Sequence, residues 1–459
     1  MGKYQGYPEY KETHLEWLRE IPNHWEIKRL KYLGEAIIGL TYSPDDVVDS
    51  EDEGTLVLRS SNVQNKALAF NDNVFVNKPI PDHLKTRKGD ILICARNGSR
   101  ALIGKNAQID ERAEGMTFGA FMSVFRSPYN DYLSKVFNSA LFEYQSGTFL
   151  TATINQLTTA NLNSFEVPLP PESERQTIAN FLDHETAKID TLIEKQQQLI
   201  KLLKEKRQAV ISHAVTKGLN PQAPMKDSGV EWLGEVPEHW EVTSIKYQCA
   251  LIDGDRGSNY PNENDYVESG IPFFSSKNIV NYKLTKKNLN YISKSKFASL
   301  GRGKLVHDDL IITVRGTIGH VAAFDSTSVG CDTGFINAQM MIIRPKKSLT
   351  DFLLYLSESD VWSHQLNLYS YGSTVKQLSN EVVGNFKLVL PHPDEMVPLL
   401  TYLKNIDDKY GKVIDKAQKQ IRLMQERRTA LISASVTGKI DVRNWQAPTS
   451  EYQAMEQTA

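Results

Sequence analysis

The sequence predicts an α+β fold in which two mixed α/β domains are separated by two long antiparallel coiled-coil helices. Three observations predict it. The sequence contains an internal repeat, so that its two halves follow the same plan. Each half ends in a charged segment in which apolar residues recur every seven positions. The interior of each half alternates short apolar runs with turn residues. The two copies would be related by a pseudo-twofold axis, because similar halves joined head to tail pair most simply in that way.

Length and composition limit the possibilities. At 459 residues the chain is too long for one core, and roughly 100–200 residues per domain suggests two to four domains. No apolar run approaches the about 20 residues of a membrane-spanning helix, and the first residues lack the apolar core of a secretion signal. Cys94, Cys249 and Cys331 form no CxxC pair, so we expect no metal site, no disulfide and a reducing, cytoplasmic compartment.

Charge is unevenly distributed along the chain. The net charge is −2, from 53 basic and 55 acidic residues. Residues 45–53 hold six acids and no base, whereas residues 283–304 hold seven bases and no acid. Because a phosphate backbone responds to local charge density, the balanced total does not exclude a nucleic acid as the ligand.

Two segments occur twice with clear similarity. EWLREIPNHWEIKRLKY at 16–32 returns as EWLGEVPEHWEVTSIKY at 231–247, with ten of 17 positions identical. LIEKQQQLIKLLKEKRQAVISHAVTKG at 192–218 returns as VIDKAQKQIRLMQERRTALISASVTGK at 413–439. Chance does not produce such ungapped agreement, so the chain consists of two copies of one plan.

The interiors of the two copies differ. Only short correspondences survive, such as GDILICAR at 89–96 with DDLIITVR at 308–315, and INQLT at 154–158 with VKQLS at 375–379. Similar frames with dissimilar interiors indicate one fold used for two different targets.

The repeat divides the chain into seven segments. Short apolar runs rich in β-branched residues predict strands in the two variable blocks. These strands are Gly54–Leu58, Ile91–Ala95, Leu310–Val314 and Met340–Ile343, and helices are expected at about 129–145 and 350–367. The predicted segments are an N-terminal anchor (1–25), a first variable block (26–168), a first spacer helix (169–219), a linker with the repeated anchor (220–240), a second variable block (241–389), a second spacer helix (390–440) and a flexible tail (441–459).

Two segments have the pattern of long helices. The first follows Leu169-Pro170-Pro171, contains neither proline nor glycine from Glu172 to Thr216, and has Gly218 as its C-cap candidate. The second has a matching stop near Gly438. Both have a heptad pattern, whose a positions are Ile189, Gln196, Leu203 and Val210 in the first helix and Tyr410, Ala417, Met424 and Leu431 in the second.

A stripe this narrow on a helix this charged requires one partner helix, and the natural partner is the other copy. The alternative is that each helix packs separately on its own domain. About 40 helical residues at 1.5 Å each would form a rod of about 60 Å. Such a rod would hold two reading domains at a set distance, so that they contact two different DNA half-sites.

The sequence contains no recognisable catalytic motif. IGKN at 103–106 and GRGK at 301–304 lack the other residues of a phosphate-binding P-loop, and no GxGxxG follows a strand. The NPPY or DPPY motif of adenine methyltransferases is absent, and no Glu-x-Lys of a nuclease core follows Asp90 at the usual spacing. His24 and His239 stand beside tryptophans of the repeat, where we expect a packing role. We therefore expect no catalytic residue.

Side chains that suit DNA follow several predicted strands, because Lys and Arg bind phosphates and Arg, Asn, Gln and Lys bind base edges. Arg96 and Arg315 are equivalent by the repeat, and they could make a shared phosphate contact or a shared internal salt bridge. The loops Gly39–Ser43 and Gly254–Asn259 could bring backbone close to a ligand or could be hairpin turns. The candidate DNA-binding residues are Tyr42, Ser60, Asn62, Gln64, Lys85, Arg87, Lys88, Arg96, Asn97, Arg100, Lys105, Arg256, Asn259, Lys277, Asn278, Lys286, Lys287, Lys294, Lys296, Arg302, Lys304 and Arg315.

Several motifs resemble those of one protein family. The EWLxE(I/V)PxHWE anchors, GLTYSP at 39–44, GDRGSNYP at 254–261 and LPPESERQTIANFLD at 169–183 look like type I restriction–modification specificity subunits. The resemblance covers residues 10–440. It implies that each variable block is a target recognition domain, which reads one half of a bipartite, asymmetric DNA sequence through the major groove.

The resemblance also implies partners. Two methyltransferase subunits would dock on the spacer helices and use S-adenosylmethionine to methylate adenine, and translocating restriction subunits, which need ATP and Mg, would join them. HPDEMVPLL at 392–400 departs from the E-Q/R-x-x-I-A pattern of Glu174–Ala179, so the first turn of the second spacer is expected to dock a partner differently. The candidate partner-binding residues are Glu174, Arg175, Gln176, Arg207 and Arg428, although such charges usually form a solvated helix face.

The leading interpretation is a non-catalytic DNA-binding subunit. One alternative is a nuclease with duplicated domains, but shared chemistry would preserve the interior residues, which differ. The other alternative is a coiled-coil scaffold that binds proteins. Exchange of the first variable block separates the two, since it changes DNA preference only if the block reads DNA.

Overall fold

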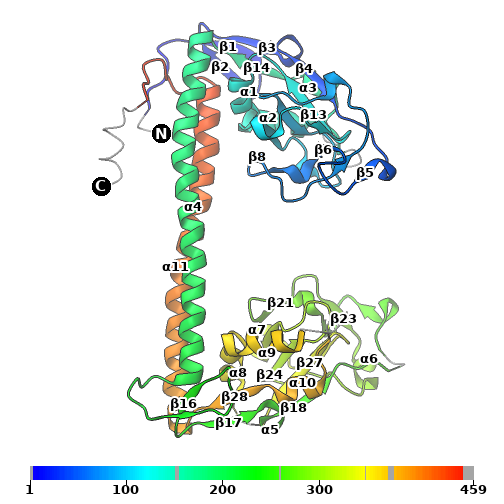
Figure 1. The fold of residues 1–459 in the computed structure, drawn as a ribbon, viewed down its shortest axis with the longest axis vertical. Helices are drawn as coiled ribbons and strands as arrows, with labels where there is room; N and C mark the ends of the chain where they lie inside the picture. Colours follow the sequence, from blue (N-terminus) through cyan, green and yellow to red (C-terminus); the bar gives the residue numbers. More distant parts are fainter. Residues whose placement is uncertain (1–3, 150–154, 258–259, 347, 371–376, 448–459) are drawn as a thin grey trace. The chain divides into compact units, whose positions relative to one another are not determined.

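The chain folds as two compact units. Unit 1 comprises Met1–Gln197 with Lys419–Ala459, and unit 2 comprises Gln198–Gln418, so each unit holds one variable block and part of each long helix. None of the helices in the described part of the chain has the length and hydropathy that a bilayer crossing requires. The computed structural model describes residues 4–149, 155–257, 260–346, 348–370 and 377–447 (Figure 1).

The described part of unit 1 contains two four-stranded sheets, with two-stranded sheets beside them. Its strands are β1 (Tyr10–Leu15), β2 (Leu18–Pro22), β3 (Glu26–Arg29), β4 (Glu35–Ile38), β5 (Val47–Val48), β6 (Thr55–Leu58), β7 (Val63–Gln64), β8 (Ala67–Leu68), β9 (Phe75–Val76), β10 (Ile91–Cys94), β11 (Asn106–Gln108), β12 (Thr117–Phe118), β13 (Met122–Arg126) and β14 (Glu166–Leu169). One four-stranded sheet is antiparallel with the order β11-β10-β13-β4, and the other has the order β12-β6-β9-β5. The pairs β1-β2, β14-β3 and β7-β8 form the two-stranded sheets. All four residues of the central strand β10 are buried, which explains its uninterrupted apolar sequence.

Unit 2 repeats this plan with a wider sheet. Its strands are β15 (Met225–Asp227), β16 (Glu235–Pro237), β17 (Glu241–Ser244), β18 (Cys249–Asp253), β19 (Tyr266–Val267), β20 (Ile271–Phe274), β21 (Ile279–Val280), β22 (Lys283–Leu284), β23 (Asn290–Ile292), β24 (Asp309–Thr313), β25 (Val321–Phe324), β26 (Phe335–Ile336), β27 (Met340–Pro345) and β28 (Lys387–Leu390). The larger sheet has the order β18-β27-β24-β25-β22-β21, and the smaller has the order β19-β23-β20-β26. The four strands expected from the sequence are confirmed as β6, β10, β24 and β27.

The helix expected in each variable block is in fact two helices. The breaks fall at Ser139 and Ser359, just before the second helix of each pair begins. There the hydroxyl of Ser433 or Ser212, on a long helix, accepts the first N–H of that second helix. A continuous helix would leave no free N–H for this bond, so the expectation of one helix was wrong. The short helices are α1 (Asn130–Phe137), α2 (Ala140–Thr148), α3 (Thr159–Ser164), α5 (Ile245–Gln248), α6 (Lys294–Ser299), α7 (Ser326–Val329), α8 (Thr350–Ser357), α9 (Asp360–Ser370) and α10 (Asn380–Asn385).

The long helices α4 (Glu172–Lys217) and α11 (Pro393–Val436) pack antiparallel in each unit (Figure 1). In unit 1 Arg428 pairs with Asp190 at 2.8 Å, and in unit 2 Arg207 pairs with Asp407 at 2.6 Å. From the first pair to the second, the residue number on α4 rises and the residue number on α11 falls, as antiparallel pairing requires. All eight heptad residues expected in the seam are buried or half-buried. The alternative of two helices packed separately is therefore wrong.

A tryptophan of each repeated anchor joins the first turn of a long helix. The buried indole N–H of Trp25 donates to Glu174 Oε1 at 3.0 Å, at the beginning of α4. The indole of Trp240 donates in the same way to Glu395 Oε2 at 2.5 Å, at the beginning of α11. A carboxylate in the first turn also faces the positive end of the helix dipole, so the contact stabilises both partners.

The histidines beside these tryptophans bind the same carboxylates. His24 Nε2 lies 2.7 Å from the Glu174 carboxylate, and His239 Nε2 lies 2.8 Å from that of Glu395. The sequence led us to expect that the histidines pack; in the structure they contact the anchor carboxylates, and their side chains are 39% and 42% exposed. Glu395 occupies the place of Glu174 although the sequence around it departs from the first copy, so the two spacers begin alike.

Each long helix ends at a glycine, as predicted. Gly218 and Gly438 both have φ of +74°, the left-handed conformation of a helix C-cap. A Cβ on Gly438 would lie 2.2 Å from Pro22 Cδ and 3.4 Å from the Trp25 ring, and one on Gly218 would lie 3.1 Å from the Trp240 ring. Each anchor tryptophan therefore contacts the end of one long helix and the beginning of the other.

A buried asparagine closes the same turn in both units. Asn62 and Asn278 are 0% and 2% exposed, and each Oδ1 accepts a backbone N–H three residues earlier at 2.9 Å. Their Nδ2 groups donate to the carbonyls of Ala69 and Thr285 at 3.0 and 3.2 Å. The expectation that these two side chains contact DNA is wrong, because they are enclosed and bonded to their own backbone.

Replacing Gly438 by alanine should destabilise unit 1. The new Cβ meets the Pro22 ring and forces a left-handed backbone on alanine, which costs about 1–3 kcal/mol. Gly411→Ala is the matched control, because its Cβ meets no atom within 4 Å inside α11 and should add up to about 1 kcal/mol of stability. Urea unfolding measures the free energy of unfolding of both variants. Equal values for the two would contradict the assignment of Gly438 as a left-handed helix cap packed against Pro22.

Replacing Asn62 by alanine should lower the free energy of unfolding by about 1–3 kcal/mol, because it leaves buried backbone groups without partners. The control is Gln64→Ala, two residues away and exposed, which should change stability by less than about 0.5 kcal/mol. Thermal unfolding of the two variants is the measurement. If Asn62→Ala is as stable as the unmodified chain, the structural role is disproved.

Candidate nucleic-acid interface

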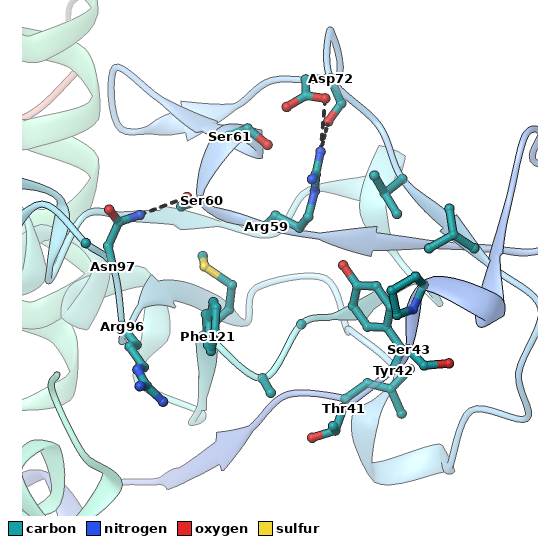
Figure 2. Close-up of a pocket in the computed structure, with 18 of the residues that line it drawn as sticks. Thr41, Tyr42, Ser43, Arg59, Ser60, Ser61, Asp72, Arg96, Asn97 and Phe121 are labelled. Carbon is teal, nitrogen blue, oxygen red and sulfur yellow. Dashed lines mark hydrogen bonds and ion pairs between the residues drawn. The ribbon is translucent and has the colours of Figure 1, made fainter. Parts of the chain in front are cut away.

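Unit 1 carries an open cleft of about 1190 Å³ at one end of β10 (Figure 2). Loops that follow β4, β6, β10 and β12 meet there, so residues far apart in sequence share one wall. The lining consists of residues 40–44, 59–61, 96–98, 119–122, 155 and 156, with Val47, Asp72 and Val74.

Polar groups with spare hydrogen-bonding capacity line one wall of the cleft. Arg59 donates to Asp72 at 3.0 Å, and Asn97 Nδ2 donates to Ser60 Oγ at 3.3 Å (Figure 2). Among the described residues, Arg59 Nε and the hydroxyl of Ser61 have no hydrogen-bond partner. Both of these atoms are buried, so they are not themselves open to a ligand in the cleft.

Arg96 and Phe121 stand together in the cleft. The Arg96 guanidinium lies 5.3 Å from the centre of the Phe121 ring, a cation–π contact, and that ring is 61% exposed. The N–H groups of Ala95 and Arg96 both donate to the Phe121 carbonyl, at 3.0 and 2.9 Å. The backbone thus fixes this pair at the end of β10, while both side chains remain open to a ligand.

Arg315 occupies the equivalent place in unit 2. A backbone bridge joins Arg315 to Gln377, just as one joins Arg96 to Gln156. Neither arginine forms an ion pair with a described residue, and Arg315 Nε is buried without a partner among them. The described contacts therefore do not support the internal salt bridge, and the shared phosphate contact stays a prediction.

Only some of the candidate residues of the first block meet at the cleft. Tyr42, Ser60, Arg96 and Asn97 line the cleft, and Lys105 reaches it by donating to the Ser60 carbonyl at 3.3 Å. Besides the buried Asn62, the other five candidates lie outside its lining. Arg100 donates to the Gly147 carbonyl, and Gln64 donates to the Ser61 carbonyl. Lys85 forms an ion pair with Asp82, and Lys88 forms one with Glu111. Arg87 and Lys88 line a separate hollow of about 270 Å³.

The basic run of the second block is spread over several elements. Lys296 pairs with Asp265 at 3.0 Å, and Lys304 lies over the Phe297 ring. The exposed candidates in this unit are Arg256, Lys277, Lys286, Lys287, Lys294 and Arg302. Asn259 lies outside the described residues.

Asp255 brings two basic loops of unit 2 together. Its carboxylate accepts the N–H groups of Gly257 and Gly301, both at 2.8 Å. These bonds lower its pKa, so the group stays ionised beside Arg256 and Arg302. The loops that carry the two arginines thereby form one surface.

The backbone of each glycine-rich loop lies close to another backbone segment of the same unit, and not to an open surface. A Cβ on Gly39 would lie 2.3 Å from the Gly119 carbonyl oxygen, and one on Gly254 would lie 2.5 Å from that of Asn337. These glycines let two chain segments cross, and neither alternative from the sequence describes that role.

A buried ion pair recurs at the other end of the central strand. Asp90 is 3% exposed and pairs with Arg126 at 2.7 Å, and Asp309 is 0% exposed and pairs with Arg344 at 2.7 Å. Both carboxylates are thus held by a neighbouring strand, which suits a structural role rather than the nuclease core considered for Asp90.

All five candidate partner-binding residues make contacts within the chain. Glu174 is buried under Trp25, so the expectation that it meets a partner is wrong. Arg175 donates to the Pro170 carbonyl, Arg207 pairs with Glu358 and Asp407, and Arg428 pairs with Asp190. Gln176 is exposed on α4 and bonds only to Asn180 of the same helix among described residues.

Sequence reasoning missed Arg59 and Phe121. Arg59 stands directly before the Ser-Ser-Asn motif that was singled out, so its position was a usable signal. Phe121 stands between a turn and a buried strand, and only the meeting of that turn with the end of β10 gives it a place in the cleft.

Comparison with known proteins agrees with this architecture. The family model described as the type I restriction modification DNA specificity domain matches twice, over residues 22–202 and 237–432. The EcoKI specificity subunit of Escherichia coli K12 is 23% identical, with 86% of this chain and 85% of the relative covered. The MjaVIII specificity subunit of Methanocaldococcus jannaschii is 22% identical, with 95% and 98% covered.

A solved chain has the same fold. It comes from work on the complex assembly and conformational transition of the type I R-M system, and it is 16% identical, with a TM-score of 0.64 over 91% of this chain and 98% of that chain. Two copies of the family domain span most of the sequence and coincide with the duplicated anchor, block and helix. The chain therefore belongs to the family of type I restriction–modification DNA specificity subunits, the non-catalytic subunits that supply DNA specificity through duplicated target recognition domains.

Proposed function

We propose that residues 26–168 and 241–389 each read one half of a bipartite, asymmetric DNA target through the major groove. The chain directs methyltransferase subunits, which use S-adenosylmethionine to methylate adenine, and restriction subunits, which use ATP and Mg. It works in the cytoplasm, where its three free cysteines stay reduced.

The proposal rests on one contrast: the two units share their supporting contacts but differ in the exposed loop residues that these contacts hold in place. The tryptophan–glutamate contact, the capping serine, the buried asparagine and the strand-end arginine all occur in both units. The exposed loop residues around them differ. A duplicated support that presents different side chains is suited to two different sequences.

The cleft of unit 1 has the chemistry that a DNA edge requires. Arg59 and Arg96 can contact phosphates or guanine, and Asn97 and the Ser60 hydroxyl can bond to base edges. The cleft is open, so a duplex can approach it without unfolding any element of the unit.

The outward faces of the long helices suit partner subunits. Leu192, Leu199 and Leu202 of α4 are 53%, 40% and 54% exposed, although they lie on a helix at heptad-like spacing. Val413 and Leu423 of α11, at positions equivalent to Leu192 and Leu202 in the repeat, are 43% and 53% exposed. Such exposed apolar side chains on the long helices of each unit support docking of a methyltransferase subunit.

Exchange of residues 26–168 for the corresponding block of another specificity subunit should change one half-site only. Adenine methylation is mapped across genomic DNA from cells that carry the exchanged chain with its methyltransferase subunits. The half-site read by residues 241–389 serves as the internal control. An unchanged first half-site would refute the proposal and favour a protein-binding scaffold.

Lengthening both spacer helices should change the distance between half-sites and leave their sequences unchanged. Seven residues inserted after Gln197 and seven after Gln418 add two helical turns to each helix, or about 10 Å. At about 3.4 Å per base pair the spacing should grow by about three base pairs. Methylation mapping measures it, and an unchanged spacing would exclude the helices as the spacer.

A further inference from the structure

The two units hold one arginine in common and differ at the residue beside it. The turn Gly119–Met122 is closed by a bond from the Met122 N–H to the Gly119 carbonyl at 2.8 Å, and the turn Asn337–Met340 is closed by the same bond at 3.1 Å. Phe121 and Gln339 are therefore equivalent positions, and both side chains are exposed.

The backbone ties each of these residues to the end of the central strand. Ala95 N–H donates to the Phe121 carbonyl at 3.0 Å, and Val314 N–H donates to the Gln339 carbonyl at 2.8 Å. Arg96 and Arg315 are the next residues along the chain. A frame bonded in the same way thus presents Arg with Phe in unit 1 and Arg with Gln in unit 2.

We propose that the repeated arginine binds a phosphate in both half-sites, and that the neighbouring residue, Phe121 or Gln339, reads one base pair. This inference rests on the proposed function and names the reading position within each recognition domain. Phe121 contacts a thymine methyl group in the first half-site, and Gln339 bonds to the N6 and N7 edge of an adenine in the second.

The division follows from what each group can distinguish. A guanidinium binds any phosphate, so the same arginine serves two different sequences. An apolar ring fits the methyl group that only thymine presents in the major groove, whereas a glutamine amide both donates and accepts, as adenine does. The Phe121 ring is 61% exposed in the cleft lining and makes a cation–π contact with the Arg96 guanidinium, so most of the ring is open to a base.

The test is the Phe121→Gln chain assembled with its methyltransferase subunits. Methylated sites in a library of random duplexes should show one base pair of the first half-site changing from thymine toward adenine, by about 5- to 150-fold in preference. The second half-site is the internal control, and Gln339→Phe should give the reciprocal change there. A first half-site unchanged at every position, or weakened equally at all positions, overturns the assignment.

The arginine is tested separately with Arg96→Ala. Affinity should fall for every sequence alike, and the slope of log affinity against log salt should decrease by about one. A change of base preference without a change of salt slope would overturn the phosphate assignment. If the unmodified complex methylates no specific sequence, the proposed function fails instead, so the two failures are distinguishable. Thermal unfolding of each variant shows whether the chain has folded.

Discussion

The contact of each anchor tryptophan with two long helices is the constraint on which the rest of the structure depends. Trp25 bonds to the carboxylate in the first turn of α4 and packs near Gly438, where α11 has ended. Trp240 does the same between the beginning of α11 and Gly218 at the end of α4. Because each tryptophan precedes the first strand of a recognition domain, this contact fixes where that domain begins against the helix pair.

A second attachment fixes how each domain faces its helices. Ser433 and Ser212 accept the first N–H of α2 and α9, so a helix of each recognition domain begins at the surface of a long helix. Two attachments at different points of one domain restrict its rotation. The loops at the end of the central strand consequently keep one orientation within their unit, as a reader of a fixed half-site requires.

The repeat made most of the architecture predictable. Heptad spacing identified the helix seam, the two glycine stops lay within two residues of the helix ends, and four strands followed from short β-branched runs. The cleft was less predictable. Asn62 and Asn278 looked like base-reading amides, yet burial decides their role, and burial depends on how distant turns meet. The seven basic residues in 283–304 suggested one basic patch on the surface. They are instead distributed over one strand, a helix and the loops around them. A linear pattern gives the order of side chains and not the surface on which they finish.

Unit 1 is discontinuous in the chain, since it combines Met1–Gln197 with Lys419–Ala459, whereas unit 2 is one uninterrupted segment. On a ribosome that adds about 5–20 residues per second, roughly 10–45 seconds separate the synthesis of the two parts of unit 1. During that interval the first half of α4 has an uncovered apolar seam, because the helical turns that cover it in the finished protein come from the last part of α11. All residues of unit 2 are therefore synthesised before unit 1 is complete. Unit 1, whose first residues are made earliest, can complete its fold only after the last turns of α11 have been synthesised.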